Sequence, residues 1–264
     1  MDLAELNNLF IGDNFFYHSK YLGIVEYIYH YDMSNYYSVK VYNRKNLYNI
    51  PDSYMMECYI NKLKKMRMIL LKNREITRLV HFTPISNLES IFERGMLSRN
   101  ILYDSDIEYC YSDDFRFDNK LDYICNSISF PNYKMFYSKR MEDLNIEWAV
   151  LSIDSDLLVS KLDTEFYRMN AASNDPFKYK YNVCSNDALE YMFYPEDRAL
   201  NLPRNYTTNP QAEVLVKDSI HPSYIKCIDT CGLNDTAKSI AINCGIYYNK
   251  DSNLFGPRKD YKRW

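Results

Sequence analysis

The first part of the chain alternates apolar and polar residues in short runs, a pattern that predicts β-strands. Three of these runs, at residues 15–18, 21–31 and 36–43, are rich in aromatic and β-branched residues. Turn-forming residues separate them, as at Gly12-Asp13-Asn14. We therefore expect a small β-rich module at residues 1–56.

A helix is predicted after Pro51, where apolar residues begin to recur every three or four positions, and it continues to about Asn73. Residues 62–78 are strongly basic, and against the single acid Glu75 their cations are Lys62, Lys64, Lys65, Arg67, Lys72, Arg74 and Arg78. One interpretation is the solvated face of a linker helix at residues 57–77. The other is a surface that contacts the phosphates of nucleic acid. The sequence leaves both open.

Beyond the basic helix, short strands alternate with helices. A strand at residues 79–82 leads into a helix that we expect Ser86 to cap and Gly95 to end. Further strands are predicted at residues 124–130, 147–153, 212–216 and 225–228. Residues 78–264 should therefore form an α+β domain, and the module at residues 1–56 should be a small, SH3-like barrel.

Composition narrows the classes of function. Only 6 residues are glycine and no G-x-G-x-x-G or G-x-x-x-x-G-K-[ST] occurs, which argues against a Rossmann or P-loop nucleotide site. The net charge of −3 disfavours a dedicated nucleic-acid-binding protein but allows a local basic groove. The 7 cysteines lack the spacing of metal ligands, so we expect free thiols, no metal and a reducing cytoplasm. We expect neither a signal peptide nor a membrane span.

Two pairs of polar residues could carry chemistry. His81 and Thr83 lie two apart on a predicted strand, so they share a face just before a helix begins. Gln211 and Glu213 start another predicted strand and by the same alternation share a face, opposite Val214. Buried polar groups need partners, so a core histidine and a structural ion pair are the ordinary interpretations. The alternative is a site in which Glu213 is the working carboxylate.

Two further segments combine charged residues with polar or aromatic neighbours. Arg116 lies among Asp113, Asp114 and Asp118, which favours a surface salt bridge over a functional role. Residues 127–140 interleave aromatic and cationic side chains. That mixture is compatible with core packing and also with stacking on bases and pairing with phosphates.

Together these segments resemble the DarT group of DNA ADP-ribosyltransferase toxins. The resemblance rests on HFTPISNLESIFERGMLS from His81, SISFPNYKMFY from Ser127, the segment Asn170–Ser173, and NPQAEVLVKDSI from Asn209. It extends over residues 78–229 and does not include the β-rich module. The resemblance implies an ADP-ribosyltransferase-like fold of split antiparallel sheets with helices, and NAD as co-substrate.

The resemblance also implies roles for individual residues. Glu213 would be the catalytic carboxylate, and Arg116 would assist it or pair with the pyrophosphate of NAD. His81 would anchor the adenosine side of NAD, with Thr83 and Asn87 beside it. In glycosyl transfer, a carboxylate that binds a sugar hydroxyl stabilises the oxocarbenium-like transition state, which agrees with this role for Glu213.

The acceptor implied by the resemblance is a base in single-stranded DNA, either thymine or guanine. Gln211 stands where related transferases read their substrate. The long irregular segment before it would bind the DNA through Arg198, Arg204 and Tyr206, and Tyr133 would stack on a base.

A DarT-like protein would be the toxin of a toxin–antitoxin or antiviral defence system, with a macrodomain protein as its antitoxin. Two alternatives stay open. The same transfer could have RNA or protein as acceptor. A non-enzymatic nucleic-acid-binding protein could instead be built on the β-rich module and the basic helix.

Overall fold

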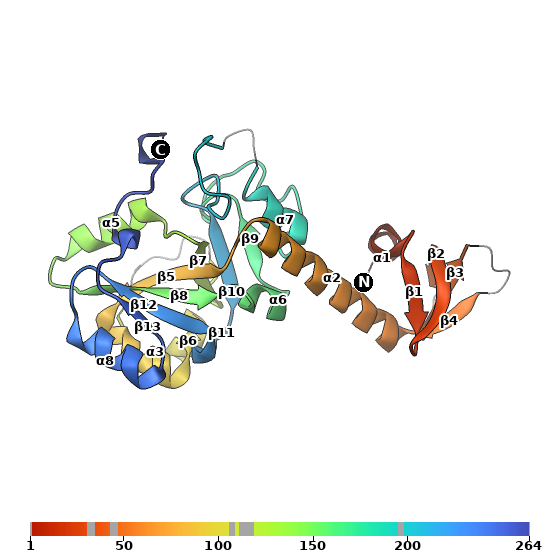
Figure 1. Ribbon diagram of the computed structural model, residues 1–264, viewed down its shortest axis with the longest axis horizontal. Helices are drawn as coiled ribbons and strands as arrows, with labels where there is room; N and C mark the ends of the chain where they lie inside the picture. Colours follow the sequence, from red (N-terminus) through yellow and green to blue (C-terminus); the bar gives the residue numbers. More distant parts are fainter. Residues whose placement is uncertain are drawn as a thin grey trace. The chain divides into compact units, whose positions relative to one another are not determined.

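The computed structural model describes residues 2–30, 35–42, 47–105, 109–110, 119–194 and 198–263, and Figure 1 shows the path of the chain. The chain divides into two compact units, Met1–Met66 and Arg67–Trp264. Each unit combines helical segments with an antiparallel or largely antiparallel sheet, which confirms the predicted α+β class.

The smaller unit contains a four-stranded antiparallel sheet with the strand order β1-β2-β3-β4. Its elements are α1 (Leu3–Phe10), β1 (Asn14–Tyr17), β2 (Lys20–His30), β3 (Tyr36–Val41), β4 (Tyr48–Pro51) and the first part of α2 (Asp52–Asn73). Phe10, Val25 and Met55 belong to one buried core, so α1 and α2 cover the same sheet. The three predicted strands are confirmed. Among the described residues no pairing joins β1 to β4, so the sheet is open and not a closed barrel.

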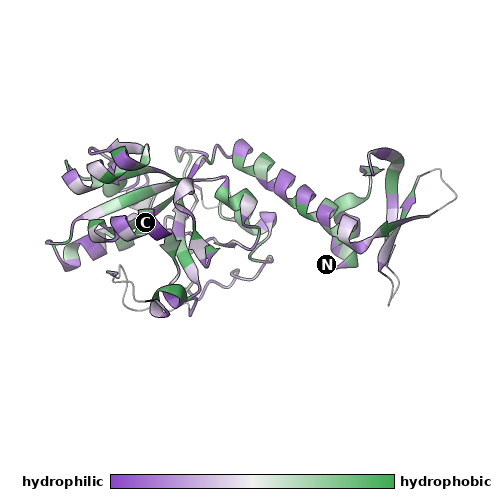
Figure 2. Cartoon of the chain, turned by 90° about the horizontal axis from the view of Figure 1, so that it is seen from below, coloured by the Kyte–Doolittle hydropathy of each residue, from purple (hydrophilic) through white to green (hydrophobic). Residues whose placement is uncertain are grey.

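The basic helix α2 has buried residues near both of its ends. Met55 at its start packs in the core of the smaller unit, and Leu71 near its end packs in the core of the larger unit. The boundary between the two compact units lies inside α2, between Met66 and Arg67. The domain limits at residues 56 and 77 stay predictions. Hydrophilic and hydrophobic residues alternate along α2 in Figure 2, as expected of a helix that buries only part of its surface.

Two of the cations on α2 have partners within the protein. Lys62 bonds to the carboxylate of Asp13. Arg67 is 2% exposed and donates to the carbonyl oxygens of Leu158 at 3.0 Å and Cys184 at 2.7 Å. Burial lowers the pKa of its guanidinium to about 10. Both positions therefore support the structural interpretation of the basic helix.

The larger unit contains a seven-stranded sheet with the order β13-β12-β8-β5-β7-β10-β9. Its strands are β5 (Arg78–Pro84), β7 (Tyr123–Ile128), β8 (Trp148–Asp154), β9 (Glu165–Tyr167), β10 (Glu213–Lys217), β12 (Ile225–Thr230) and β13 (Tyr247–Asn249), and the short strands β6 (Met96–Leu97) and β11 (Ser219–Ile220) pair apart from it. Its helices are α3 (Leu88–Arg94), α4 (Arg99–Tyr103), α5 (Tyr133–Glu142), α6 (Leu157–Ser160), α7 (Asn186–Tyr191) and α8 (Asp235–Cys244), with 3₁₀ turns at Ile85–Asn87, Pro222–Tyr224, Asn253–Phe255 and Tyr261–Arg263. All neighbouring strands of the large sheet run antiparallel except β12 and β13.

Both faces of the large sheet are covered. Leu79 and Leu151 lie in a core with residues of α3 and α8, whereas Val80 and Val150 lie in a second cluster with Phe136 of α5. Successive residues of a strand point to opposite faces, so a strand covered on both sides is apolar without alternation. This explains the continuous apolar run of β8, and Figure 2 shows strands of this unit in hydrophobic green.

The large sheet splits between β5 and β7. Leu79 pairs with Ile128 and Val80 with Ser127, and the ladder between the two strands then ends. Residues 123–126 of β7 pair with β10 instead. The two halves of the sheet separate beyond Val80, in agreement with the predicted split antiparallel sheets.

The helix after β5 begins later than predicted. Ser86 lies inside a 3₁₀ turn, and the residue before α3 is Asn87, which makes no capping bond with its side chain. That side chain contacts Thr83 and the backbone of Cys110 instead. The prediction that Ser86 caps α3 was therefore wrong, because the polar side chain next to the helix is used to hold another segment.

Within the described part of the chain, no helix has the length and apolar character needed to cross a membrane. The 7 cysteines are free thiols. Among the described residues, no three His, Cys, Asp or Glu side chains are grouped closely enough to hold a metal ion.

Gly95 connects α3 to β6 with a φ of +94°, and a Cβ at this position would lie 2.8 Å from the carbonyl oxygen of Ile220. Since that neighbour is backbone, it cannot move aside without disturbing β11. We expect Gly95→Ala to lower the free energy of unfolding of the larger unit by about 2–3 kcal/mol. Urea denaturation followed by tryptophan fluorescence measures this loss, because Trp148 is buried in that unit.

Gly245→Ala is the matched control. Gly245 ends α8 with a φ of +66°, but a Cβ there would meet open space. Its replacement should cost only about 1 kcal/mol, from backbone strain alone. Equal losses for the two variants would show that the approach of Ile220 does not constrain the turn at Gly95.

Candidate functional site

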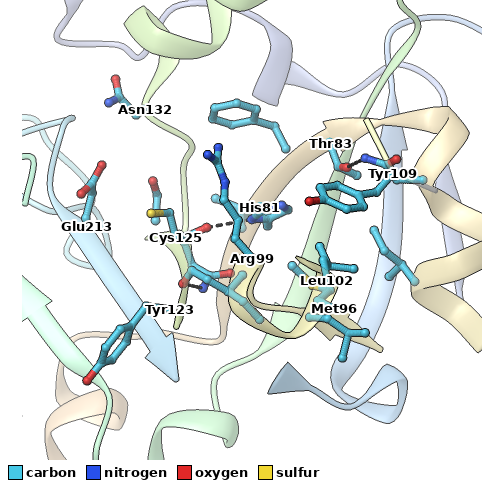
Figure 3. Close-up of a pocket in the computed structure, with 18 of the residues that line it drawn as sticks. His81, Thr83, Met96, Arg99, Leu102, Tyr109, Tyr123, Cys125, Asn132 and Glu213 are labelled. Carbon is cyan, nitrogen blue, oxygen red and sulfur yellow. Dashed lines mark hydrogen bonds between the residues drawn. The ribbon is translucent and has the colours of Figure 1, made fainter. Parts of the chain in front are cut away.

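A cavity of about 400 Å³ lies where the large sheet splits. Residues of β5, β7, the start of β10, α3 and α4 form much of its wall. Figure 3 shows His81 and Glu213 on opposite sides of this space, with the side chain of Arg99 between them in that view. Folding thus brings the two halves of the predicted site, His81 and Glu213, to one cavity.

His81 bridges the split in the sheet. Its Nδ1 atom lies 2.7 Å from the carbonyl oxygen of Cys125 on β7. Because a carbonyl oxygen only accepts hydrogen bonds, Nδ1 carries the hydrogen in this contact. A neutral imidazole in this tautomer has an acceptor at Nε2. The half-buried ring lies in the cavity wall in a fixed orientation.

Glu213 is the first residue of β10 and is 8% exposed. Its Oε1 accepts a hydrogen bond from Nδ2 of Asn170 at 2.9 Å, and its Oε2 accepts one from the backbone N–H of Ala171 at 2.9 Å. A buried carboxylate needs such donors, because its loss of hydration would otherwise be costly. The carboxylate is therefore held in one orientation in the wall of the cavity.

Asn170 and Ala171 belong to the segment Asn170–Ser173, which is part of the family resemblance but for which the sequence analysis predicted no role. Nothing in the local pattern reveals the contact, because the carboxylate and its two donors are more than 40 residues apart in the chain. A polar stretch of small residues is typical of many loops. The structure identifies it as the segment that orients Glu213.

Thr83 and Asn87 both line the cavity and hold its rim together. The side chain of Asn87 donates to Oγ1 of Thr83 at 3.0 Å and to the carbonyl oxygen of Cys110 at 2.9 Å, and it accepts from the backbone N–H of Cys110 at 2.9 Å. Asn87 thereby fixes the short segment that carries Tyr109, another wall residue. A direct contact of Thr83 or Asn87 with NAD stays a prediction.

Arg99, at the start of α4, was not among the predicted site residues. It lines the cavity, and in Figure 3 its guanidinium reaches into the space beside His81. The sequence offered one signal, a cation directly after the segment of the His81 motif, but such a cation is common on surfaces. Arg116, the cation that the sequence did favour, lies outside the described residues.

A second buried carboxylate, Glu165 on β9, lies outside the cavity wall described here. It accepts a hydrogen bond from the hydroxyl of Tyr167 at 2.7 Å and forms an ion pair with Lys120 at 2.6 Å. Burial and then the contact with Glu165 raise the pKa of Tyr123, whose ring does line the cavity. Both carboxylates have partners within the protein, but only that of Glu213 is in the cavity wall.

Gln211 does not share a strand face with Glu213. β10 begins at Glu213, and Gln211 lies in the preceding turn, where its backbone N–H donates to Oδ1 of Asn209 at 2.8 Å. The alternation on which the prediction relied applies only within a strand. The predicted geometry was therefore wrong, because the Asn209 side chain folds this stretch into a turn. A substrate contact by Gln211 stays a prediction.

Arg198 holds part of the loop before Gln211 from within. Arg198 donates to the carbonyl oxygens of Tyr206, at 2.6 Å, and Pro203, so its guanidinium organises the loop. A contact of Arg198 with DNA stays a prediction. Arg204 is well exposed and forms only a loose ion pair, 3.9 Å from Glu75.

Two predicted aromatic residues, Tyr206 in this loop and Tyr133 on α5, belong to the same cluster. The ring of Tyr206 packs against Phe130, with the ring centroids 5.4 Å apart. Tyr133, the first residue of α5, packs against the same aromatic cluster, and burial raises the pKa of both tyrosines. Neither is among the residues that line the cavity, so a stacking role for them stays a prediction.

The cavity presents an oriented carboxylate on one side and hydrogen-bonding and cationic groups on the other. A carboxylate in such a position can bind a sugar hydroxyl and stabilise positive charge on the neighbouring carbon. A guanidinium fork matches the oxygens of a phosphate. The arrangement fits a nucleotide whose sugar meets Glu213 and whose phosphates meet Arg99.

Comparison with known proteins identifies a family to which this chain is similar. Residues 80–242 match the family model described as "DarT: ssDNA thymidine ADP-ribosyltransferase, DarT". A comparison with curated proteins finds no match. The match leaves out the smaller unit and the last segment of the larger one.

Two solved structures are similar to this chain in fold. Thermosipho africanus DarTG in complex with ADP-ribose is 17% identical with a TM-score of 0.44, over 68% of this chain and 51% of that chain, so this chain spans about half of its length. Thermus sp. 2.9 DarT in complex with ADP-ribosylated ssDNA is 15% identical with a TM-score of 0.46, over 69% of this chain and 97% of that chain.

The contact between Asn170 and Glu213 can be tested through folding. Asn170→Asp places a second carboxylate next to the first, and two such groups hold a shared proton, so the pKa of the pair rises in the folded state. A raised carboxyl pKa destabilises the folded protein at neutral pH but not in acid. We expect a deficit of about 2 kcal/mol at pH 8 that disappears as the pH falls to about 4. Urea denaturation across this range measures it.

Asn170→Ala is the control, because it removes the same hydrogen bond and adds no charge. It should cost about 1 kcal/mol with a much weaker dependence on pH. Identical pH profiles for the two variants would show that Asn170 does not contact the Glu213 carboxylate in solution.

Proposed function

This chain belongs to the DarT family of ssDNA thymidine ADP-ribosyltransferases, and from that premise we propose that it transfers ADP-ribose from NAD⁺ to thymine in single-stranded DNA. The observation that carries the proposal is the carboxylate of Glu213, buried, oriented by two donors and facing a cavity that His81 also lines. The resemblance left thymine and guanine open, and the family description favours thymine.

The reaction exchanges one glycosidic bond for another. The bond between nicotinamide and the ribose C1 carbon breaks, and nicotinamide leaves with the bonding electrons. A ring nitrogen of the base then bonds to that carbon and loses its proton. Thymine in DNA has a single N–H, at N3, which makes N3 the acceptor atom of the proposal.

Glu213 is the proposed catalytic carboxylate. Positive charge develops on the ribose as nicotinamide departs, and a fixed carboxylate beside the ring stabilises it through the hydroxyl group that it binds. The hydrogen bonds from Asn170 and Ala171 support this role, because the carboxylate need not reorganise during the reaction. We propose that Glu213 also takes the proton from N3 of the base.

His81 and Arg99 are the proposed anchors of NAD⁺. Nε2 of His81 would accept a hydrogen bond from the adenosine portion, since its Nδ1 is committed to Cys125. Arg99 would pair with the pyrophosphate. Thr83 and Asn87 would act by shaping the rim of the cavity, and Arg116, by its place in the family pattern, would assist the transfer.

The DNA is proposed to approach along the loop that precedes Glu213. Gln211, at the end of that loop, would read the base, and the exposed guanidinium of Arg204 would pair with phosphate. Tyr133 and Tyr206 would support a base extruded from the strand.

We further propose that the protein is a toxin that acts in the cytoplasm, where free thiols persist, and that a macrodomain protein reverses its modification. The runner-up keeps the transfer and replaces DNA by RNA or protein. A non-enzymatic nucleic-acid-binding protein is less well supported, because a DNA-binding surface alone gives no reason to bury and orient a carboxylate in a cavity.

The decisive variant is Glu213→Gln, which keeps the shape of the side chain and removes its charge. With NAD⁺ and a thymine-containing oligonucleotide we expect wild-type protein to add ADP-ribose, and the variant to lose at least about 100-fold in kcat. Mass spectrometry of the oligonucleotide measures the product. Parallel reactions with RNA and with cell lysate identify another acceptor, and transfer to either in preference to DNA would overturn the proposed acceptor.

Asp229→Asn is the matched control for Glu213→Gln. Asp229 is 2% exposed and its carboxylate also accepts two hydrogen bonds, from Ser152 at 3.2 Å and Asn249 at 2.9 Å, but it lies outside the cavity wall. Its neutralisation should leave kcat close to the wild-type value. Equal losses for the two variants would point to general instability and contradict a catalytic role for Glu213.

Binding of NAD⁺ tests the two anchors separately. In the Glu213→Gln background, which does not consume the ligand, His81→Asn and Arg99→Gln should each raise the Kd by about tenfold. Isothermal titration calorimetry measures it. Lys238→Gln, on the exposed side of α8, removes one positive charge as Arg99→Gln does, and it should leave the Kd for NAD⁺ unchanged. An unaltered Kd for Arg99→Gln would remove Arg99 from the proposed site.

A further inference from the structure

A buried arginine near the end of the larger unit holds the loop that leads to Glu213. Arg258 is 2% exposed, and its guanidinium donates to the carbonyl oxygens of Thr207 at 2.9 Å and Thr208 at 3.0 Å. Asp260 accepts from the same guanidinium through both oxygens, at 2.7 and 2.6 Å. Each of the three guanidinium nitrogens donates at least one hydrogen bond, so the group is held in a single orientation.

The carbonyls that Arg258 holds lie just before the catalytic strand. Thr208 is tied from its other side as well, because its backbone N–H donates to the carbonyl oxygen of Met192 at 2.9 Å. Asn209 then accepts from the N–H of Gln211 and closes the turn that ends at Glu213. A displacement of Thr207 and Thr208 would therefore also move the adjacent segment, which would present the base to Glu213.

The segment that carries Arg258 is itself anchored. Leu254 and Phe255 lie in the aromatic cluster beside α5, and the ring centroids of Phe255 and Phe136 are 5.1 Å apart. Arg140 of α5 donates to the carbonyl oxygen of Phe255 at 2.7 Å. Residues 254–260, here called the clamp segment, therefore fasten the loop to α5, the helix that begins at the predicted substrate residue Tyr133.

We propose that Arg258, oriented by Asp260, is a positioning residue of the transfer reaction. It touches neither NAD⁺ nor DNA. It fixes the loop before Glu213 and thereby sets how the acceptor base meets the ribose. The inference rests on the proposed function, but it concerns a residue outside the segment, 80–242, that matches the family.

The shape of the guanidinium is essential to this role. A planar fork reaches two carbonyl oxygens and a carboxylate at once, whereas a lysine ammonium is a point charge without that geometry. Arg258→Lys keeps the charge beside Asp260 and loses the simultaneous grip on Thr207 and Thr208. Loss of alignment by a small displacement can lower a rate by up to about 100-fold.

The test compares full-length wild-type protein with Arg258→Lys. We expect kcat/KM for the thymine-containing oligonucleotide to fall by about tenfold or more, while the Kd for NAD⁺ stays within about twofold. Hydrogen–deuterium exchange should show faster exchange at residues 207–212 and unchanged exchange in β5. Arg258→Lys with wild-type kcat/KM and unchanged exchange in the loop would overturn the proposal.

Arg67→Lys is the matched control. Arg67 is equally buried, at 2% exposure, and also donates to two carbonyl oxygens, but neither belongs to the loop before Glu213. It should lower stability without changing kcat/KM for the folded protein, and an equal loss of kcat/KM would overturn a specific role for Arg258. Wild-type protein that fails to modify DNA, RNA or lysate would overturn the proposed function, whereas hydrogen exchange at residues 207–212 would still decide whether Arg258 fixes the loop.

Discussion

At Val80 the hydrogen-bond ladder between β5 and β7 stops, and the rest of the site depends on how that interruption is tolerated. Paired strands lie about 4.8 Å apart, which leaves no space for a ligand between them. Separation of the strands would leave buried backbone groups without partners, at considerable cost. The imidazole of His81 donates a hydrogen bond to the carbonyl oxygen of Cys125, and this bond replaces part of the missing hydrogen-bond ladder. The side chain of His81 thus supplies a hydrogen-bond partner to the backbone of β7 and also lines the cavity that the split creates.

The same solution recurs in the irregular segments around the cavity. Asn87 satisfies both backbone groups of Cys110, Asn170 orients Glu213, and two arginines, Arg198 and Arg258, hold the carbonyl oxygens of the loop before it. The segments at Cys110 and at residues 203–208 lack the regular ladder of a strand or a helix, so polar side chains supply partners to their backbone groups. The site is rigid because its loops are bonded like secondary structure.

Local pattern was enough to predict the features that depend on local physics. The longer strands and the apolar run of β8 follow from periodicity, whereas the short strands β4, β9 and β13 were not predicted. The choice of His81 and Glu213 depended also on the family resemblance, and their roles stay predictions. Gln211 was misplaced because a single side chain, Asn209, turns the chain where alternation suggested a strand. Ser86 was misread as a cap because the choice between it and Asn87 depends on a contact with Cys110. Arg99 and the partners of Glu213 could not be inferred, since they are brought together only by long-range packing.

The clamp segment separates two boundaries that are often treated as one, the limit of recognisable similarity and the limit of the folded unit. Similarity to the family ends at residue 242. A protein shortened to that limit would retain every residue that lines the cavity. It would nevertheless lose Leu254 and Phe255 from an aromatic core. It would also lose Arg258, the hydrogen-bond donor to the carbonyl oxygens of Thr207 and Thr208. An enzyme cut at the edge of its family resemblance would keep its catalytic residues and lose the support that aligns them.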